Sequence, residues 1–148
     1  MHAISEREFP MTEARQATVL VVEDNMDNMF VVMELLHNDV GVYYVDSAMT
    51  GYALFRLLET RPTLSPDLIL LDIEIPGENG YGVLQRIRVH PRLTTTRVVA
   101  VTGHISPADI ERARQAGFDG FIGKPINSEC FPEQIKRILQ GESVWEAR

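Results

Sequence analysis

TVLVVEDN, residues 18–25, is an apolar run that ends directly in two carboxylates and an amide. Its apolar residues are continuous rather than alternating, which is typical of a strand that is buried on both faces. The stretch LILLDIE, residues 68–74, repeats the pattern and again ends in acidic residues. Strands of this kind occur mainly in parallel sheets that carry helices on each side. These two stretches therefore predict an α/β fold whose strands end in charged side chains.

A helical pattern of apolar residues follows each apolar run along the chain. Besides strands at 18–22 and 67–71, we expect strands at 42–45, 97–101 and 119–122. The helices after them are expected at 26–38, 48–59, 81–90, 106–117 and 127–140. Five strand–helix pairs in this order predict a (βα)₅ α/β fold, which is a doubly wound, five-stranded parallel sheet.

Helix ends are marked most clearly around residue 106. Ser106 is expected to cap the fourth helix, with Pro107 in its first turn and Asp109 near the positive end of the helix dipole. That helix should end near Gly117, and either Asn127 or Ser128 should cap the last one. The turn-forming residues 76–80 predict a loop.

Length and composition limit the class of protein. The 148 residues correspond to about one domain, for which we expect a flexible extension at 1–17, a domain at 18–140 and a C-terminal tail at 141–148. Fourteen Lys and Arg against twenty-one Asp and Glu give a net charge of −7, which argues against non-specific binding to nucleic acid or to anionic membranes. No apolar stretch approaches the roughly 20 residues that span a bilayer, and no secretory signal is visible, so we expect a cytoplasmic protein.

Chemically useful side chains follow four of the five predicted strands. The first run ends in Glu23 and Asp24, the third in Asp72, the fourth in Thr102, and the fifth runs on to Lys124. In open α/β sheets, ligands bind outside the carboxyl ends of the strands. We therefore expect three carboxylates, one hydroxyl and one ammonium group to meet at one edge of the sheet.

The charges of this set predict its ligands. Three crowded carboxylates repel one another unless a cation is bound, and oxygen ligands suit Mg²⁺. A lysine and a threonine beside them can contact a phosphoryl group, and an aspartate can act as a nucleophile that forms an acyl phosphate.

The chain resembles a response-regulator receiver domain of two-component signalling over residues 18–140, a domain of flavodoxin-like architecture. The separations 102 − 72 = 30 and 124 − 102 = 22 suit this family. The segments that carry the resemblance are VVEDN at 21–25, DLILLDIEIP at 67–76, VAVTGH at 99–104 and GFIGKPI at 120–126.

The resemblance implies a role for each residue at the predicted edge. Asp72 is the implied phosphoacceptor, and Thr102 and Lys124 are implied to contact the phosphoryl group. Asp24 is implied to bind Mg²⁺, or Mn²⁺ in its place, directly. Glu23 is implied to act through water, and the backbone carbonyl of Glu74 is a further implied ligand.

Further positions are implied to act beside the phosphoryl site. Phe121 lies at the aromatic switch position of the family, where its rotamer couples to movement of Thr102, and the peptide bond before Pro125 is expected to be cis. Glu74 and His104 each lie two residues beyond a site residue. We hypothesise that they approach each other and limit the access of water to the acyl phosphate; the alternative is that both face solvent.

The function implied is a stand-alone phosphoacceptor that is no enzyme beyond its own phosphorylation and dephosphorylation. Its partners are a histidine kinase or a histidine phosphotransfer protein, without nucleic acid or membrane, and the change in state would switch protein contacts. The implied docking region is 24–33, although Met29, Phe30 and Met33 are expected to be core residues. Phosphorylated receivers often pair through a region that corresponds to 106–140 here, which makes a homodimer through that region an option.

Two other functions use similar residues. A pseudo-receiver scaffold that is never phosphorylated shares the fold, although neither the acidic residues nor Thr102 nor Lys124 is lost here. A Mg²⁺-dependent aspartyl phosphatase of the haloacid dehalogenase type also uses a strand-end aspartate and a lysine. It needs a second aspartate where this chain has Glu74, and a cap region for which 148 residues leave no room.

Overall fold

Six parallel strands form the central sheet in the computed structural model, which describes residues 11–75 and 77–147. Their order across the sheet is β2-β1-β3-β6-β7-β8. The predicted parallel, doubly wound sheet is confirmed, and β8 adds a strand that the apolar runs do not predict. The strands are β1 (Thr18–Val22), β2 (Tyr44–Ala48), β3 (Leu68–Asp72), β6 (Arg97–Thr102), β7 (Gly120–Gly123) and β8 (Trp145–Glu146).

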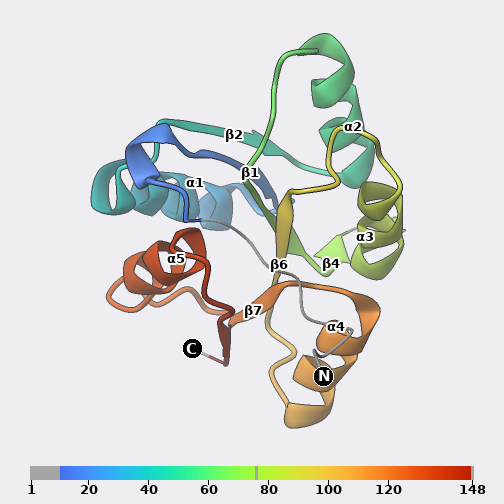
Figure 1. Ribbon diagram of the computed structural model, residues 1–148. Coiled ribbons are helices and arrows are strands. Elements are labelled where there is room, and N and C mark those ends of the chain that lie inside the picture. The colour runs from blue at the N-terminus through green and yellow to red at the C-terminus, as the bar shows by residue number, and fades with distance from the viewer. Residues whose placement is uncertain (1–10, 76, 148) are drawn as a thin grey trace, which may run out of the picture.

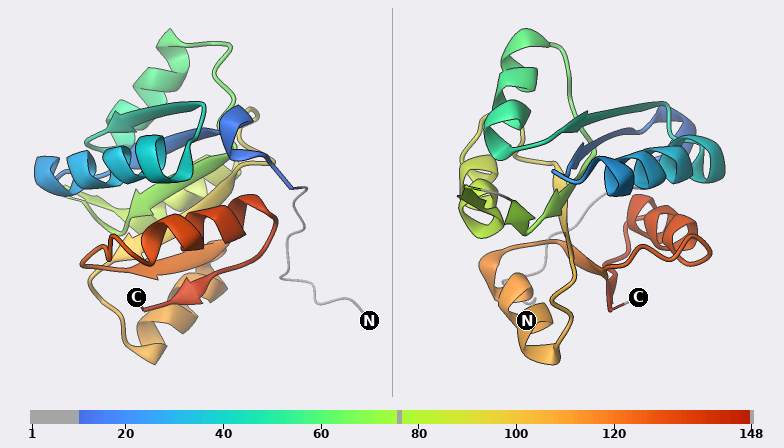
Figure 2. Two further views of the ribbon diagram at one scale, coloured as in Figure 1. Left: turned by 90° about the vertical axis from the view of Figure 1, so that its left-hand side faces the viewer. Right: turned by 180° about the vertical axis from the view of Figure 1, so that it is seen from behind.

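Helices cover both faces of this sheet (Figure 1). The first and last helices lie on one face, and the three middle helices lie on the other, as the views from the side and from behind also show (Figure 2). The helices are α1 (Met26–Glu34), α2 (Gly51–Thr60), α3 (Gly80–Arg88), α4 (Pro107–Ala116) and α5 (Phe131–Leu139), with a 3₁₀ turn η1 (Ala14–Gln16) and a π-helical continuation of α1, η2 (Leu35–Val40). None of these described helices is long and apolar enough to cross a membrane.

The sheet separates two hydrophobic cores. In β3, Leu68 and Leu70 pack into the core beneath α1 and α5, while Ile69 and Leu71 pack into the core beneath α2, α3 and α4. Successive side chains of a strand point to opposite faces, so a strand between two helical layers must be apolar at every position. The continuous runs that identified the strands in the sequence are therefore explained by burial on both faces.

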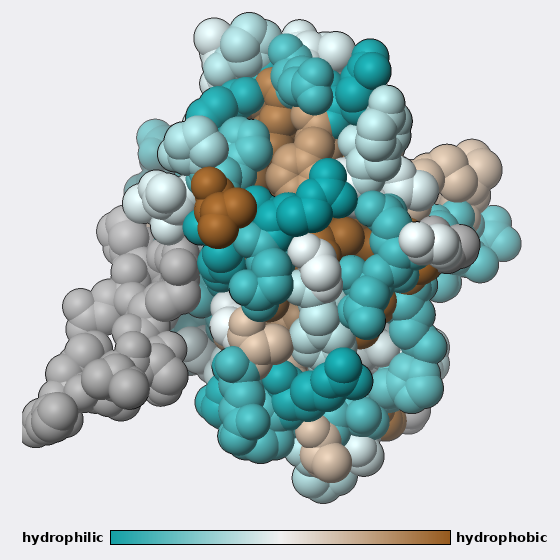
Figure 3. Space-filling view, turned by 90° about the vertical axis from the view of Figure 1, so that its right-hand side faces the viewer, coloured by the Kyte–Doolittle hydropathy of each residue, from teal (hydrophilic) through white to brown (hydrophobic). Residues whose placement is uncertain are grey.

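The face of the molecule that α2, α3 and α4 cover is mostly hydrophilic. Teal side chains dominate the space-filling view of that side of the molecule, and the brown ones form small, separate patches (Figure 3). Scattered apolar side chains of this kind are normal on a soluble surface and indicate no binding site by themselves.

Several element boundaries differ from the prediction. β2 begins at Tyr44 rather than at residue 42, and α5 begins at Phe131 rather than near residue 127. Asn127 does act as a cap, but its Oδ1 accepts hydrogen bonds from the backbone N–H groups of Glu129 and Cys130 in a turn that precedes the helix. The predicted loop at 76–80 also contributes to a short antiparallel hairpin, β4 (Glu74–Ile75) with β5 (Glu78–Asn79).

The predicted ends of α4 are confirmed. Ser106 and Asp109 form a reciprocal capping box, Pro107 occupies the first turn, and Gly117 ends the helix with a φ of 107°. A positive φ of this size is strained for any residue with a side chain, which is why glycine ends the helix.

The segment before β1 contacts the rest of the fold from residue 12 onward. The backbone N–H of Thr12 donates to the carbonyl of Leu139 in α5, and Ala17 is fully buried. Residues 1–10 of the predicted extension lie outside the described residues.

Arg92 ties two loops together at the amino edge of the sheet. Its guanidinium donates to the carbonyls of Leu58 at 2.6 Å, Arg61 at 2.9 Å and Leu64 at 2.6 Å. The guanidinium presents five N–H donors in a rigid plane, whereas lysine has three on a compact ammonium group and glutamine has two.

The Arg92→Ala variant should therefore lose stability, because it leaves three carbonyls without this donor. We expect a loss of about 1–3 kcal/mol in the free energy of unfolding, measured by urea denaturation. Arg56→Ala, which removes an exposed arginine from α2, is the matched control and should change stability by less than about 0.5 kcal/mol. Equal losses in the two variants would contradict this role of Arg92.

Candidate functional site

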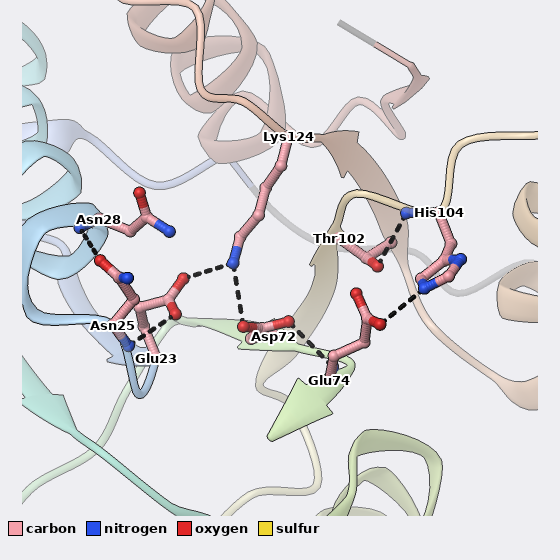
Figure 4. A network of polar contacts seen from close by, with 8 residues as sticks. All are labelled: Glu23, Asn25, Asn28, Asp72, Glu74, Thr102, His104 and Lys124. Atoms are coloured by element: carbon pink, nitrogen blue, oxygen red, sulfur yellow. Dashed lines mark hydrogen bonds and ion pairs between the residues drawn. The ribbon is translucent and has the colours of Figure 1, made fainter. Parts of the chain in front are cut away.

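Four strands bring the predicted side chains together at the carboxyl edge of the sheet. Glu23 and Asp24 directly follow β1, and Asp72 is the last residue of β3. Thr102 is the last residue of β6, and Lys124 directly follows β7. All the predicted residues drawn in Figure 4, which omits Asp24, point into one shared region.

Three carboxylates form the floor of the site. One oxygen each from Glu23, Asp24 and Asp72 lies within 4.8 Å of the others. Glu23 and Asp72 are each only 4% exposed, and Asp24 is half-buried. Such a set of oxygen donors fits a hard divalent cation such as Mg²⁺.

Lys124 lies between two of these carboxylates. Its Nζ is 2.7 Å from Glu23 Oε1 and 2.9 Å from Asp72 Oδ2. One ammonium against three carboxylates leaves a charge of −3 + 1 = −2, which a divalent cation would balance. The sequence analysis expected Lys124 at this edge but not its pairing with Glu23.

The electrostatics of Asp72 reflect mainly its burial. Burial raises the pKa of Asp72 to about 6, although the hydrogen bonds from Lys124 and from the backbone of Glu74 act in the opposite direction. Burial lowers the pKa of Lys124, but its hydrogen bonds to Glu23 and Asp72 outweigh this effect and the net change is upward. Lys124 is therefore protonated, whereas ionisation of the Asp72 carboxyl group costs free energy in the folded chain.

Backbone contacts orient the acidic groups. The N–H of Glu74 donates to Asp72 Oδ1 at 2.9 Å, and the N–H of Asn25 donates to Glu23 Oε2 at 3.0 Å. Asn25 also caps α1, because its Oδ1 accepts from the N–H of Asn28 at 2.9 Å. This double role of Asn25 was not predicted, although its position after two acidic residues and before a helix is a capping signal.

Thr102 stands on the other side of Asp72. It is buried, and its Oγ1 accepts a hydrogen bond from the N–H of His104 at 3.2 Å. Its carbonyl accepts from the N–H of Lys124 at 2.8 Å, so the ends of β6 and β7 are joined next to the site. The peptide bond between Lys124 and Pro125 is cis, the geometry that the resemblance implies.

Glu74 and His104 meet at the mouth of the site, as the hypothesis of their approach requires. His104 Nε2 is 2.6 Å from Glu74 Oε2, and both side chains are more than half exposed (Figure 4). Behind them lies a cavity of about 310 Å³, which is also lined by Thr102, Tyr81 and the buried Phe121.

Comparison with known proteins agrees with this geometry. The sequence pattern of the response regulator receiver domain matches residues 19–136. This chain belongs to the receiver domain family. Phosphorylation of an aspartate and binding of Mg²⁺ at an acidic cluster are typical of receivers.

Individual relatives resemble the chain over most of its length. It is 34% identical over 122 residues to the polar-differentiation response regulator DivK of Brucella ovis, which covers 82% of this chain and 95% of DivK. It is also 34% identical over 121 residues to the two-component system protein A of Emericella nidulans, of which it spans 17%.

Solved receivers share the fold. The chemotaxis response regulator CheY4 of Vibrio cholerae has a TM-score of 0.71 at 25% identity, covering 83% of this chain and 98% of CheY4. The receiver domain of the sensor histidine kinase PA1611 of Pseudomonas aeruginosa has a TM-score of 0.65 at 26% identity, covering 84% of this chain and 95% of that domain. That structure has a magnesium ion in its active-site cleft.

Ionised Asp72 should destabilise the fold when no divalent cation is bound. Its pKa is about 6 in the folded chain and roughly 3.9 in an unfolded one. The folded state therefore binds more protons between these values, and stability falls as the pH rises through them. In EDTA near neutral pH, Asp72→Asn should raise the free energy of unfolding by about 1–3 kcal/mol.

Urea denaturation across the pH range measures this difference in the free energy of unfolding. The difference should shrink as the pH is lowered toward the pKa of a free carboxyl group. Added Mg²⁺ should stabilise the wild type more than Asp72→Asn, because the variant lacks one ligand charge. Equal stabilities of the two proteins near neutral pH would contradict the raised pKa.

Proposed function

We propose that this receiver is a phosphoacceptor switch that takes a phosphoryl group from a phosphohistidine donor onto Asp72. The observation that carries the proposal is the buried Asp72 carboxylate, which lies 2.9 Å from Lys124 Nζ and within 4.8 Å of the oxygens of Glu23 and Asp24. Receivers as a family act with histidine kinases or histidine phosphotransfer proteins, which supplies the class of donor.

In the proposed transfer, an Asp72 oxygen forms a bond to phosphorus while the phosphorus–nitrogen bond of the donor breaks. The electron pair leaves on the imidazole nitrogen, which then takes up a proton. In this step Lys124 Nζ and Thr102 Oγ1 would donate hydrogen bonds to phosphoryl oxygens, where negative charge gathers. The chain thus catalyses its own phosphorylation and dephosphorylation and acts on no separate substrate.

The cation site in this proposal consists of Asp24 directly, Glu23 through water, Asp72, and the backbone carbonyl of Glu74. Mg²⁺, or Mn²⁺ in its place, would balance the charge that the incoming phosphoryl group adds. Transfer from a kinase or phosphotransfer protein would place the chain in the cytoplasm, and the output would be a change in protein contacts.

The exposed start of α1 favours a helical partner. Met26 and Phe30 are 70% and 68% exposed, so the expectation that Phe30 is a core residue is wrong. Met29 and Met33, which were expected in the core as well, are partly buried. Because α1 follows β1, its first turns lie next to the carboxyl edge, and we propose that Met26 and Phe30 contact the donor protein.

Phe30→Ala should slow phosphotransfer from a histidine phosphotransfer protein by about tenfold, which corresponds to about 1.4 kcal/mol of lost contact. Phosphorylation by acetyl phosphate should not change, because that donor needs no docking surface. Tyr43→Ala removes an equally exposed aromatic side chain (74%) just before β2, at the opposite edge, and is the matched control. Equal transfer rates in the two variants would contradict the docking surface.

Acetyl phosphate with Mg²⁺ tests the central proposal. Intact mass should show one phosphoryl adduct that requires Mg²⁺ and disappears in Asp72→Ala. No adduct from acetyl phosphate or from a phosphohistidine protein, with the fold intact, would favour a pseudo-receiver scaffold. Rapid release of phosphate from added phosphate esters without an adduct would favour the aspartyl phosphatase.

We also propose that the contact between Glu74 and His104 shields the acyl phosphate from water. Glu74→Ala and His104→Ala should each shorten the phosphoryl half-life by a factor of about 3–10, or roughly 1 kcal/mol in the barrier. The double variant should lose little more than either single variant, because one contact is removed in all three. Unchanged half-lives would show that both side chains merely face solvent.

A further inference from the structure

The segment 144–147, here called the strap, lies along the free edge of β7. Within it, β8 pairs with β7 in parallel, with Trp145 opposite Phe121 and Glu146 opposite Ile122. The N–H of Phe121 donates to the carbonyl of Val144 at 2.7 Å. The strap, red in Figure 2, thus runs beside the orange strand β7 at the end of the sheet.

Side chains fasten the strap to the helices on both faces. Trp145 stacks against the guanidinium of Arg114 in α4, whose carbon is 4.2 Å from the ring centre. Glu146 accepts hydrogen bonds from Gln134 and Arg137 of α5, each at 2.9 Å. Four residues therefore bridge α4, β7 and α5.

Glycines make room for the strap in β7. A Cβ at Gly120 would come within 2.8 Å of the carbonyl oxygen of Val144, and a Cβ at Gly123 would overlap the carbonyl oxygen of Ala147. Both glycines have an ordinary negative φ, so close approach of the strap, rather than backbone conformation, explains why side chains are excluded here.

The same strand connects the strap to the phosphoryl site. Thr102 lies opposite Gly123 in the register of β6 and β7, and Phe121 is fully buried against the cavity that Thr102 also lines. The aromatic switch that the resemblance implies would let the Phe121 ring enter that cavity when Thr102 moves toward a phosphoryl oxygen. Trp145 packs against the core that contains Phe121, so such a move removes support behind Trp145.

We propose that the strap covers the edge of β7 while Asp72 is unphosphorylated and detaches when Asp72 carries a phosphoryl group. This inference rests on the proposed function. A paired strand of two residues has few hydrogen bonds to lose, which places it among the least stable parts of a fold. While attached, the strap prevents any other strand from pairing with β7; once it is released, the edge of β7 is open to another strand.

Trp145 is the only tryptophan, so its fluorescence reports on the strap directly. The full chain is treated with Mg²⁺ and acetyl phosphate, and intact mass is recorded on the same samples. We expect a red shift of the emission, stronger quenching by acrylamide and several-fold faster hydrogen exchange at the Phe121 amide. All three changes should decay with the phosphoryl adduct and be absent in Asp72→Asn.

Two glutamates give a matched pair of variants. Glu146→Ala removes both contacts with α5 and should increase quenching of Trp145 and exchange at Phe121 before any phosphorylation. Glu142→Ala also removes an ion pair with Arg137, of 3.3 Å, but lies outside the strap and should leave both signals unchanged.

Three outcomes would overturn the proposal. An adduct on Asp72 with unchanged Trp145 fluorescence and Phe121 exchange would refute the strap and leave the proposed function intact. Slower exchange at Phe121 after phosphorylation would show that the strap tightens instead. Absence of any adduct would overturn the proposed function and, with it, control of the strap by Asp72.

Discussion

Repulsion among three carboxylates is the constraint to which the rest of the site responds. Two unit charges 4.8 Å apart repel by roughly 3 kcal/mol at an effective dielectric constant of about 20. Lys124 offsets part of this repulsion by contacting both Glu23 and Asp72, and the remaining charge of −3 + 1 = −2 calls for a cation. Burial is the main cause of the raised pKa of Asp72, and repulsion from Glu23 adds to it. Keeping a buried carboxylate at this position therefore lowers the stability of the fold, a common feature of functional sites.

The two cores hold that arrangement in register. Leu70 and Leu71 face opposite cores, so a slip of β3 by one residue would place each of them on the wrong side and would move Asp72 away from the other carboxylates. The site residues belong to four strands, and the steps along the chain from one strand's site residue to the next range from 124 − 102 = 22 to 72 − 24 = 48 residues. Their side chains meet only because the helical layers fix all four strands relative to one another.

Features that are local in sequence could be predicted, and features that depend on distant contacts could not. The strands of the two-sided core are continuous apolar runs, and the side chains that follow them mark the carboxyl edge. The strap contains no such run. Its residues Trp145 and Glu146 are held instead by Arg114, Gln134 and Arg137 of the neighbouring helices, and these contacts leave no local pattern in the sequence. The exposure of Phe30 was mispredicted for a related reason: residues 29–33 are all apolar, so the helical period does not show which side faces the core.

The geometry also bears on the two competing functions. A phosphatase of the aspartyl type needs its second carboxyl group free to protonate a leaving group, whereas the Glu74 side chain turns outward to His104 and only its backbone N–H contacts Asp72 (Figure 4). That arrangement favours keeping a phosphoryl group over expelling it. A fixed scaffold has no use for Asp72 as a buried carboxylate with a pKa of about 6, because an amide or an apolar side chain there would leave the chain more stable. The cost of the site makes physical sense if a divalent cation balances its negative charge and, together with Lys124, attracts a phosphoryl group.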